Sequence, residues 1–202
     1  MTPFTQLCSI AAPMPDADID TDIIFPARFL VLTQKVGLGP YAFYEKRFDQ
    51  QGRKLRDFIL HRSQWRSAKI LVTGANFGCG SSREQAPWAL SDLGLRCLIA
   101  PSFGEIFYAN CLNNGILPIK LEASEHAQVM AVAEVGQSLT VNLQTCSITL
   151  PDGQTIGFSI AERARQALLE GRDEIGAICQ LQERITAFEH QQKQLQPWLY
   201  AA

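Results

Sequence analysis

One short stretch of this 202-residue chain, GANFGCGSSREQ at positions 74–85, concentrates residues suited to chemistry. It combines three glycines and a cysteine with two adjacent serines, an arginine and a glutamate. A phosphate-binding P-loop would need a lysine, which the stretch lacks. A dinucleotide-binding turn would need glycine where Arg83 stands, and a nucleophile elbow would need glycine where Glu84 stands. The stretch therefore belongs to none of these three motifs.

The residues on either side of this stretch predict an anion-binding turn. An apolar run of strand length precedes it at 68–73, and an apolar helical pattern begins near Ser82. The free N–H groups and positive end of a helix attract anions. Arg83 adds a guanidinium fork suited to a carboxylate or phosphate, and Ser81 and Ser82 add hydroxyl groups.

Two simpler interpretations of the same residues remain open. Glycine-rich turns between a strand and a helix also serve packing alone, and Ser82 with Gln85 has the spacing of a helix-capping box. Cys79 is either a nucleophile or a small apolar packing residue. No histidine lies near it in sequence, which favours packing.

The segments around this turn predict an α/β fold with one domain over residues 1–202. Strand-length apolar runs alternate with helical patterns, an order that implies parallel strands joined by right-handed crossovers. The central strands are expected at 68–73, 96–100 and 116–121, with helices from Ser82 to Gly94 and over 103–113. A strand at 5–11, a Pro/Asp-rich loop at 13–22, an irregular loop at 31–40 and a short helix at 41–48 precede them. A helix at 124–135, short strands at 138–143, 147–150 and 155–158, and helices at 161–170 and 174–192 follow.

Two apolar helix faces are expected to pack into the core. The helix at 103–113 carries Phe103, Ile106, Phe107 and Leu112 on its apolar side. The last helix carries a stripe made of Ile175, Ile178, Leu181, Ile185 and Phe188.

Composition narrows the classes of function. A net charge of −2 gives no electrostatic footprint for nucleic acid, and the basic stretch at 46–66 is interrupted by aspartates. No run approaches the roughly 20 apolar residues of a membrane helix, and the first residues lack the basic region of a signal peptide. The six cysteines are scattered without a C-x-x-C pair, which indicates reduced thiols in a cytoplasm. The same scatter argues against a complete iron–sulfur or zinc site, so no metal ligand is assigned.

The loop also resembles a known family. NFGCGSSRE followed by APWAL is similar to the signature of the 3-isopropylmalate dehydratase small subunits, relatives of the swivelling C-terminal domain of aconitase. The segments 18–30, 43–48, 100–121 and 174–189 also resemble that family, in the family's order. The resemblance implies a swivelling β/β/α domain with a parallel-strand core, flanking helices and short accessory strands.

The resemblance also implies a chemistry. The family isomerises 2-isopropylmalate to 3-isopropylmalate in leucine biosynthesis by reversible loss and re-addition of water. Carried over to this chain, Ser81 is the catalytic base, acting as an alkoxide, and Ser82 and Arg83 bind a substrate carboxylate. Asp22 orients polar groups across the cleft, although an aspartate that only caps a loop is the simpler interpretation. The [4Fe–4S] cluster belongs to a separate large subunit, so this chain is expected to be inactive alone.

Two positions depart from the family pattern. Gln85 stands where the family usually has histidine, and Lys35 stands where the substrate loop often has arginine. Lysine keeps the positive charge of a substrate-binding residue but lacks the bidentate fork. Two other functions therefore remain open. One is the same reaction on another malate, such as citramalate or homocitrate; the other is a binding subunit without catalysis.

Overall fold

A computed structural model describes residues 1–80, 82–179 and 181–200 of the chain. Its centre is a seven-stranded mixed sheet with the strand order β4-β3-β2-β1-β5-β6-β7. The strands are β1 (Gln6–Met14), β2 (Ile70–Thr73), β3 (Cys97–Ala100), β4 (Leu117–Lys120), β5 (Ser138–Asn142), β6 (Ser147–Thr149) and β7 (Thr155–Gly157). The first four strands pair in parallel, and β5, β6 and β7 continue the sheet in antiparallel pairs. The predicted parallel core and the short accessory strands are both confirmed.

Strand β1 is longer than the sequence pattern predicts. Pro13 and Met14, which we assigned to a loop, pair in parallel with Val72 and Thr73. Proline usually interrupts a strand because it lacks an N–H donor. Here the register with β2 carries β1 three residues beyond its predicted end, to the edge where the glycine-rich loop begins.

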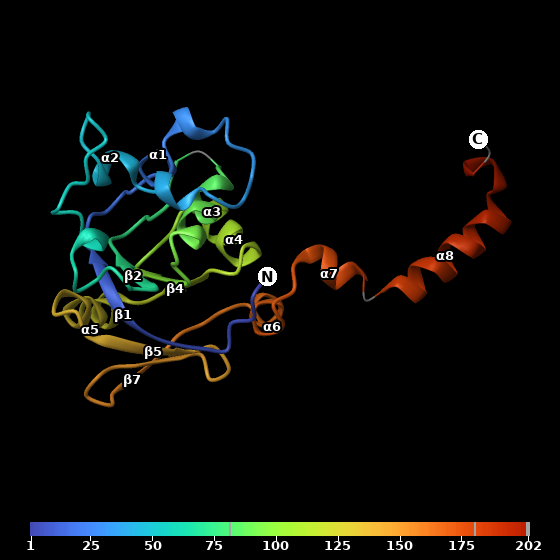
Figure 1. Cartoon of the computed structure of the whole chain (residues 1–202). Helices are drawn as coiled ribbons and strands as arrows, with labels where there is room; N and C mark the ends of the chain where they lie inside the picture. The colour runs from blue at the N-terminus through green and yellow to red at the C-terminus, as the bar shows by residue number, and fades with distance from the viewer. Residues whose placement is uncertain (81, 180, 201–202) are drawn as a thin grey trace.

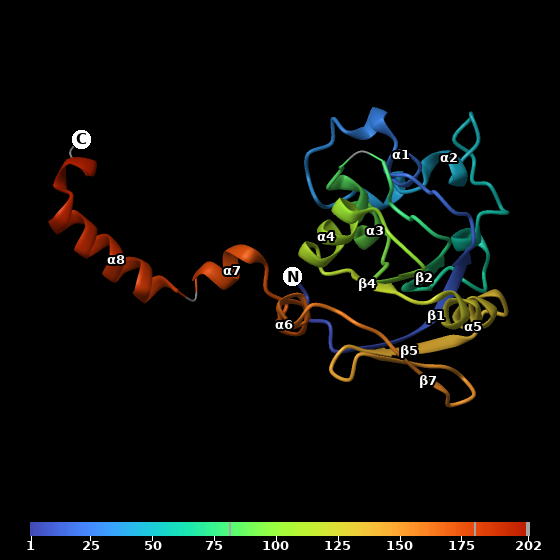
Figure 2. The ribbon, with the colours of Figure 1, turned by 180° about the vertical axis from the view of Figure 1, so that it is seen from behind.

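Of the eight α-helices in the described residues, α1 to α6 lie with the sheet in the body of the protein (Figures 1 and 2). The eight helices are α1 (Thr21–Ile24), α2 (Tyr44–Arg47), α3 (Gln85–Asp92), α4 (Glu105–Asn113), α5 (Ala123–Glu134), α6 (Glu162–Glu170), α7 (Glu174–Cys179) and α8 (Gln182–Leu195). Short 3₁₀ turns lie at η1 (Ala27–Phe29), η2 (Gly39–Tyr41), η3 (Ile59–His61) and η4 (Pro197–Leu199). None of the helices in this described part of the chain is both long and apolar enough to cross a membrane.

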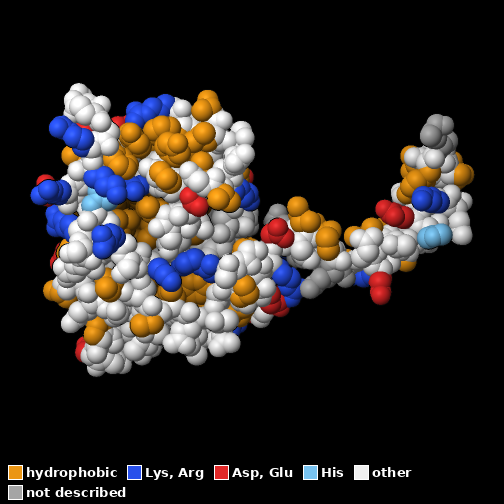
Figure 3. Space-filling view, in the orientation of Figure 1, with side chains coloured by type: hydrophobic (Ala, Val, Ile, Leu, Met, Phe, Trp, Pro, Cys, Tyr) orange, Lys and Arg blue, Asp and Glu red, His pale blue; other side chains and the backbone are white. Residues whose placement is uncertain are grey.

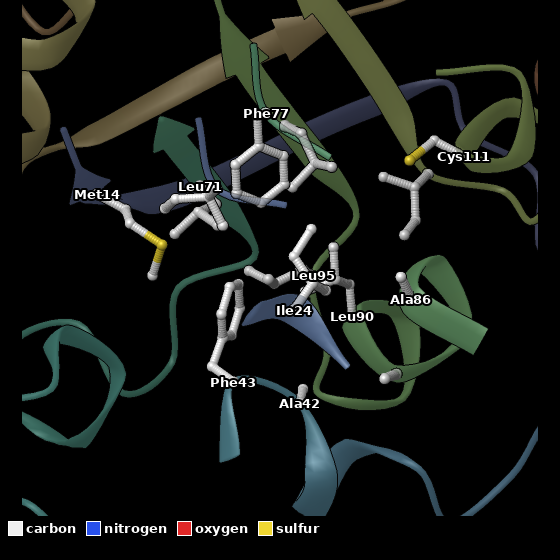
Figure 4. Packing of buried hydrophobic residues seen from close by; sticks show 14 of the residues in the cluster. Met14, Ile24, Ala42, Phe43, Leu71, Phe77, Ala86, Leu90, Leu95 and Cys111 are labelled. Carbon is white, nitrogen blue, oxygen red and sulfur yellow. The ribbon is translucent and has the colours of Figure 1, made fainter. Parts of the chain in front are cut away.

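Apolar clusters cover both faces of the parallel strands. Leu71 of β2 packs with Phe43 and Phe77 in the cluster shown in Figure 4, on the side of α1, α3 and α4. Its neighbours Ile70 and Val72 belong to the second cluster, on the side of α5 and α6. Successive side chains of a strand point to opposite faces, so a strand buried on both faces reads as a continuous apolar run.

The start of α3 corrects one prediction. The helix begins at Gln85 rather than near Ser82, and the side chain of its N-cap residue makes no capping hydrogen bond. Its N-cap, Glu84, already has helical backbone angles, φ −70° and ψ −24°. The capping-box interpretation of Ser82 is therefore wrong, and the serine lies in the loop ahead of the helix.

The C-terminal helices correct another prediction. Beyond α6 the chain leaves the body, and α7 and α8 project away from the sheet (Figures 1 and 2). The expected single helix is divided into these two pieces, and its apolar stripe is not in the core. Ile175 is 72% exposed, Ile178 56% and Phe188 61%. A helical apolar period predicts an apolar face but not which element covers it, and here other helices already cover both faces of the sheet.

Candidate active site

The glycine-rich loop is held by the segment that follows β1. Beyond the last paired residues of β1 and β2, the two chains continue side by side. Gly78 N–H donates to Ile19 O at 2.7 Å, and Thr21 N–H donates to Cys79 O at 3.0 Å. An isolated parallel bridge joins Asp20 to Cys79. The Pro/Asp-rich segment, which the sequence predicts only as a loop, thus holds residues 78 and 79 through backbone hydrogen bonds.

A left-handed residue turns the loop at its centre. Asn76 has φ +57°, a conformation that asparagine tolerates better than most residues. Its side-chain amide donates to Asp18 Oδ1 at 2.7 Å, and its backbone N–H donates to Ser102 Oγ at 2.8 Å. The loop is therefore tied both to the segment after β1 and to the segment after β3.

Two glycines let the loop lie directly on the start of α4. A Cβ added to Gly78, whose φ is +73°, would stand 2.2 Å from Phe107 Cγ. A Cβ added to Gly104 would stand 2.3 Å from the carbonyl oxygen of Gly78. Real side chains do not pack this closely, so both positions require glycine.

A hollow of about 190 Å³ opens where the loop, α1 and α4 meet. It is lined by Thr21, Gly78, Gly80, Ser82, Arg83, Gly104, Glu105, Ile106 and Phe107. Sequence reasoning identified Ser82 and Arg83 but missed Glu105 and Ile106. Ile106, which the sequence places on the apolar side of its helix, lines this hollow and is 55% exposed. The available signal was topological, because α4 follows β3 at the same carboxyl edge of the sheet as the loop that follows β2.

An ion pair joins two of the predicted site residues. Arg83 donates from Nη1 to Asp22 Oδ1, and the two side chains are 15% and 51% exposed. Asp22 lies in the first turn of α1, where Asp20 is the N-cap and accepts a bond from Ile23 N–H at 2.7 Å. The structure therefore brings Asp22, Arg83 and Ser82 to one place. Ser81, the predicted base, lies outside the described residues.

Lys35 occupies a different hollow. Its Nζ lies 4.9 Å from the centre of the Trp88 ring and 3.4 Å from Asn114 Oδ1. Trp88 Nε1 donates to the same oxygen at 2.9 Å, so the three side chains form one cluster on α3 and the end of α4. This hollow, about 370 Å³, shares no lining residue with the one beside Arg83. The structure thus does not bring Lys35 together with Ser82 and Arg83.

The surroundings of Cys79 favour a packing role for its thiol. Burial raises the pKa of Cys79, and the nearby carboxylates of Asp18 and Asp20 raise it further. The nucleophilic form of cysteine is the thiolate, which a raised pKa makes scarcer at neutral pH.

The residues that line the hollow beside Arg83 do not suit an iron–sulfur cluster. Such clusters are held by cysteine thiolates, with histidine as the common substitute. The hollow has neither among its lining residues. In the residues that the structure describes, no group of three or more His, Cys, Asp or Glu side chains could hold a metal ion.

Both the sequence and the fold of this chain are similar to those of known proteins. The sequence-family model of the aconitase C-terminal domain matches residues 1–124, and the family model LeuD_N matches residues 127–162. A 3-isopropylmalate dehydratase small subunit of Paramagnetospirillum magneticum is 48% identical over 201 residues, covering 98% of this chain and 100% of the relative. One from Dinoroseobacter shibae is 50% identical with the same coverage. The crystal structure of 3-isopropylmalate dehydratase (leuD) from Methanocaldococcus jannaschii has a TM-score of 0.65 at 25% identity, covering 91% of this chain and 99% of that one.

The parallel core, the antiparallel extension and the loop at the carboxyl edge define a protein of the aconitase C-terminal domain class. Within that class, the full-length relatives show that this chain belongs to the family of 3-isopropylmalate dehydratase small subunits.

Proposed function

We propose that this chain is the small subunit of a heteromeric hydro-lyase that isomerises 2-isopropylmalate to 3-isopropylmalate through isopropylmaleate, in the leucine pathway of the cytoplasm. The observation that carries the proposal is the Arg83–Asp22 pair beside Ser82 at a hollow in the loop that bears the family signature. Family membership supports the proposed reaction, and this geometry supports Arg83 and Ser82 as the residues proposed to bind the substrate's carboxylate.

Arg83 is positioned to bind a carboxylate. Asp22 accepts from Nη1, and no other acceptor among the described residues takes a bond from this guanidinium. We propose that the N–H groups of the fork that bond to no described residue bind the substrate, and Ser82 supplies a hydroxyl at the same hollow. We therefore propose that Asp22 orients the guanidinium through Nη1, and that other N–H groups of the guanidinium bind the substrate.

The reaction requires removal of a weakly acidic proton. In the forward direction, the carbon next to a carboxylate loses a proton while its neighbour loses the hydroxyl group, which gives the alkene and water. Water then adds across the same double bond with the opposite orientation. We propose Ser81 as the group that takes and returns the proton. Donors that hold the adjacent carboxylate, Arg83 and Ser82, stabilise the negative charge that develops there.

The rest of the site is proposed to lie on another chain. A hollow of about 190 Å³ is smaller than the roughly 300–1,000 Å³ of ordinary ligand sites, which fits half of a shared site. We assign the [4Fe–4S] cluster to the large subunit, since the donor set of the hollow does not suit it.

We propose that Lys35 binds the substrate after it leaves its present contacts with Trp88 and Asn114. In the structure it lies against Trp88 and Asn114, away from Arg83. It can reach a substrate at the hollow only after the loop around it has left this cluster. A cation–π contact at an exposed site is worth about 0.5–1 kcal/mol and a hydrogen bond about 0.5–1.5 kcal/mol, so breaking both contacts costs about 1–2.5 kcal/mol.

Reconstitution tests the proposed function. The chain is purified with the large subunit from the same genome under anaerobic conditions, and hydration of isopropylmaleate, citraconate and cis-homoaconitate is compared. Preferred hydration of isopropylmaleate is the expected result. Preference for citraconate or cis-homoaconitate would move the assignment to another malate. Hydration of none of them by a complex with an intact cluster would indicate a binding subunit without catalysis.

A further inference from the structure

The C-terminal arm, which we define as residues 174–200, presents an apolar face that the body of the protein does not cover. Leu181, the N-cap of α8, is followed on the helix by Ile185, Phe188 and Leu195, at intervals of four, three and seven residues. These intervals place them on one side of a helix. Phe188 is 61% exposed, Leu195 67% and Leu181 44%. Figure 3 shows apolar side chains along the arm, away from the main body.

This arm would be marginal without a partner. Isolated helices shorter than about 12–15 residues are barely stable in water, and α8 has 14 residues. Most helical stability in proteins comes from packing an amphipathic face. The exposed face of α8 therefore needs a cover that this chain does not provide.

We propose that the C-terminal arm binds an apolar groove on the large subunit, with Leu181, Ile185, Phe188 and Leu195 as its anchors. The inference rests on the proposed function, because that function supplies the partner. The anchors have the spacing of a helix laid in a groove. From Glu174 to Tyr200 the arm is as long as the roughly 20–30 residues that each side of a stable interface contributes.

A groove on the large subunit fits the arm better than a second copy of this chain. Pairing of two identical helices through such a face needs apolar positions sustained over about three or four heptads. Helix α8 spans about two heptads, and Gln192 interrupts its apolar side. A preformed groove does not require a partner helix of equal length, so it tolerates this short face.

The direction of the arm agrees with this partner. In both Figures 1 and 2 the arm extends away from the body beyond α6, and its far end lies at the height of the end of the body that carries α1 and α3. The hollow beside Arg83 lies at that end, where α1, α4 and the glycine-rich loop meet. A subunit that completes the hollow can therefore also lie against the arm.

The test compares substitutions on the two sides of α8. Phe188→Glu and Leu195→Glu place charges on the apolar face, and Phe188→Ala removes side-chain area without adding a charge. Thr186→Glu and Gln194→Glu add the same charge on the opposite, exposed side and serve as matched controls. The dissociation constant of each full-length variant for the cluster-loaded large subunit is measured under anaerobic conditions.

The expected result is a rise of about tenfold or more in the dissociation constant for the three apolar-face variants, as for a buried aromatic anchor, with little change for the controls. Equal binding by all variants would overturn the inference. A wild-type chain that sediments alone as a dimer, and becomes monomeric with Phe188→Glu, would also overturn it in favour of a second copy.

The readout separates this inference from the proposed function. A complex that depends on Phe188 but hydrates no substrate would support the arm and contradict the function. An active complex whose affinity is unchanged by Phe188→Glu would contradict the arm and leave the function intact.

Discussion

Replacing Gly78 with alanine tests how the glycine-rich loop is held on α4. The residue has φ +73°, and an added Cβ would stand 2.2 Å from Phe107 Cγ. The left-handed conformation costs an alanine about 1–2 kcal/mol. Forcing an extra methyl into a packed site costs about 1–3 kcal/mol more. The free energy of unfolding should therefore fall by roughly 2–5 kcal/mol.

Gly153→Ala is the matched control. Gly153 has φ +88° in the turn between β6 and β7, and an added Cβ would meet nothing within 4 Å. This variant has the conformational cost without the clash, so we expect a loss of about 1–2 kcal/mol. The difference between the two variants isolates the contact with Phe107.

Urea unfolding of both variants, followed by circular dichroism, measures these losses. If unfolding is two-state, a shift in midpoint at constant slope reports the change in stability. Combining Gly78→Ala with Phe107→Ala should cost less than the sum of the two single variants, because alanine lacks the Cγ and Cδ1 atoms of Phe107 that the added methyl would meet. Equal losses for Gly78→Ala and Gly153→Ala would refute the close packing of the loop on α4.

Two further predictions concern other parts of the fold. Arg47 is buried, and its Nη1 donates to Gly39 O at 2.7 Å and to Ala42 O at 2.9 Å. Because Arg47→Met leaves these carbonyl groups without their donor, it should lower the unfolding free energy by about 2 kcal/mol or more. An unchanged urea midpoint would contradict that role. Burial raises the pKa of Cys97 far above its ordinary value, whereas Cys8 is exposed. Iodoacetamide at neutral pH should therefore label Cys8 first and label Cys97 only after the protein unfolds. Mass spectrometry of the digested protein reads this order, and early labelling of Cys97 would contradict its burial.

The strands of the parallel core were predictable because their burial is two-sided. ILVT in β2 and CLIA in β3 are continuous apolar runs, and every residue of both strands is buried. A strand with both faces covered reads as a continuous apolar run, which distinguishes it from a polar loop. The PDG turn at 151–153 was predictable for a different reason, since its residue types favour a tight connection between β6 and β7.

The positions of apolar helix side chains in the fold were less predictable. Ile106 and Phe188 both follow a helical period, yet Ile106 lies at the candidate site and Phe188 on the projecting arm. Periodicity specifies which side of a helix is apolar, and the surrounding elements decide what that side meets. The sequence alone did not reveal that other helices already cover both sides of the sheet.

The site was predictable where its residues are neighbours in sequence. Ser82 and Arg83 follow the glycines directly, and the structure places both at one hollow. The contact of Arg83 with Asp22 depends on how the segment after β1 runs beside the loop; the family resemblance suggested Asp22 as a site residue but not its pairing with Arg83. Lys35 shows the limit of that transfer, because here it lies on Trp88 instead. Ser81 stays a prediction.

The measurement that tests the central claim most directly is the effect of Arg83→Lys on hydration of isopropylmaleate by the reconstituted complex. Lysine keeps the charge and loses the fork, so one charge-assisted hydrogen bond, about 1.5–3 kcal/mol, should disappear. We predict that kcat/KM falls by about tenfold or more while affinity for the large subunit is unchanged. Arg53→Lys, at an arginine whose side chain is 76% exposed and pairs with Asp49, should leave both quantities unchanged. An Arg83→Lys complex with the wild-type kcat/KM would contradict the assignment of Arg83 as the carboxylate-binding residue.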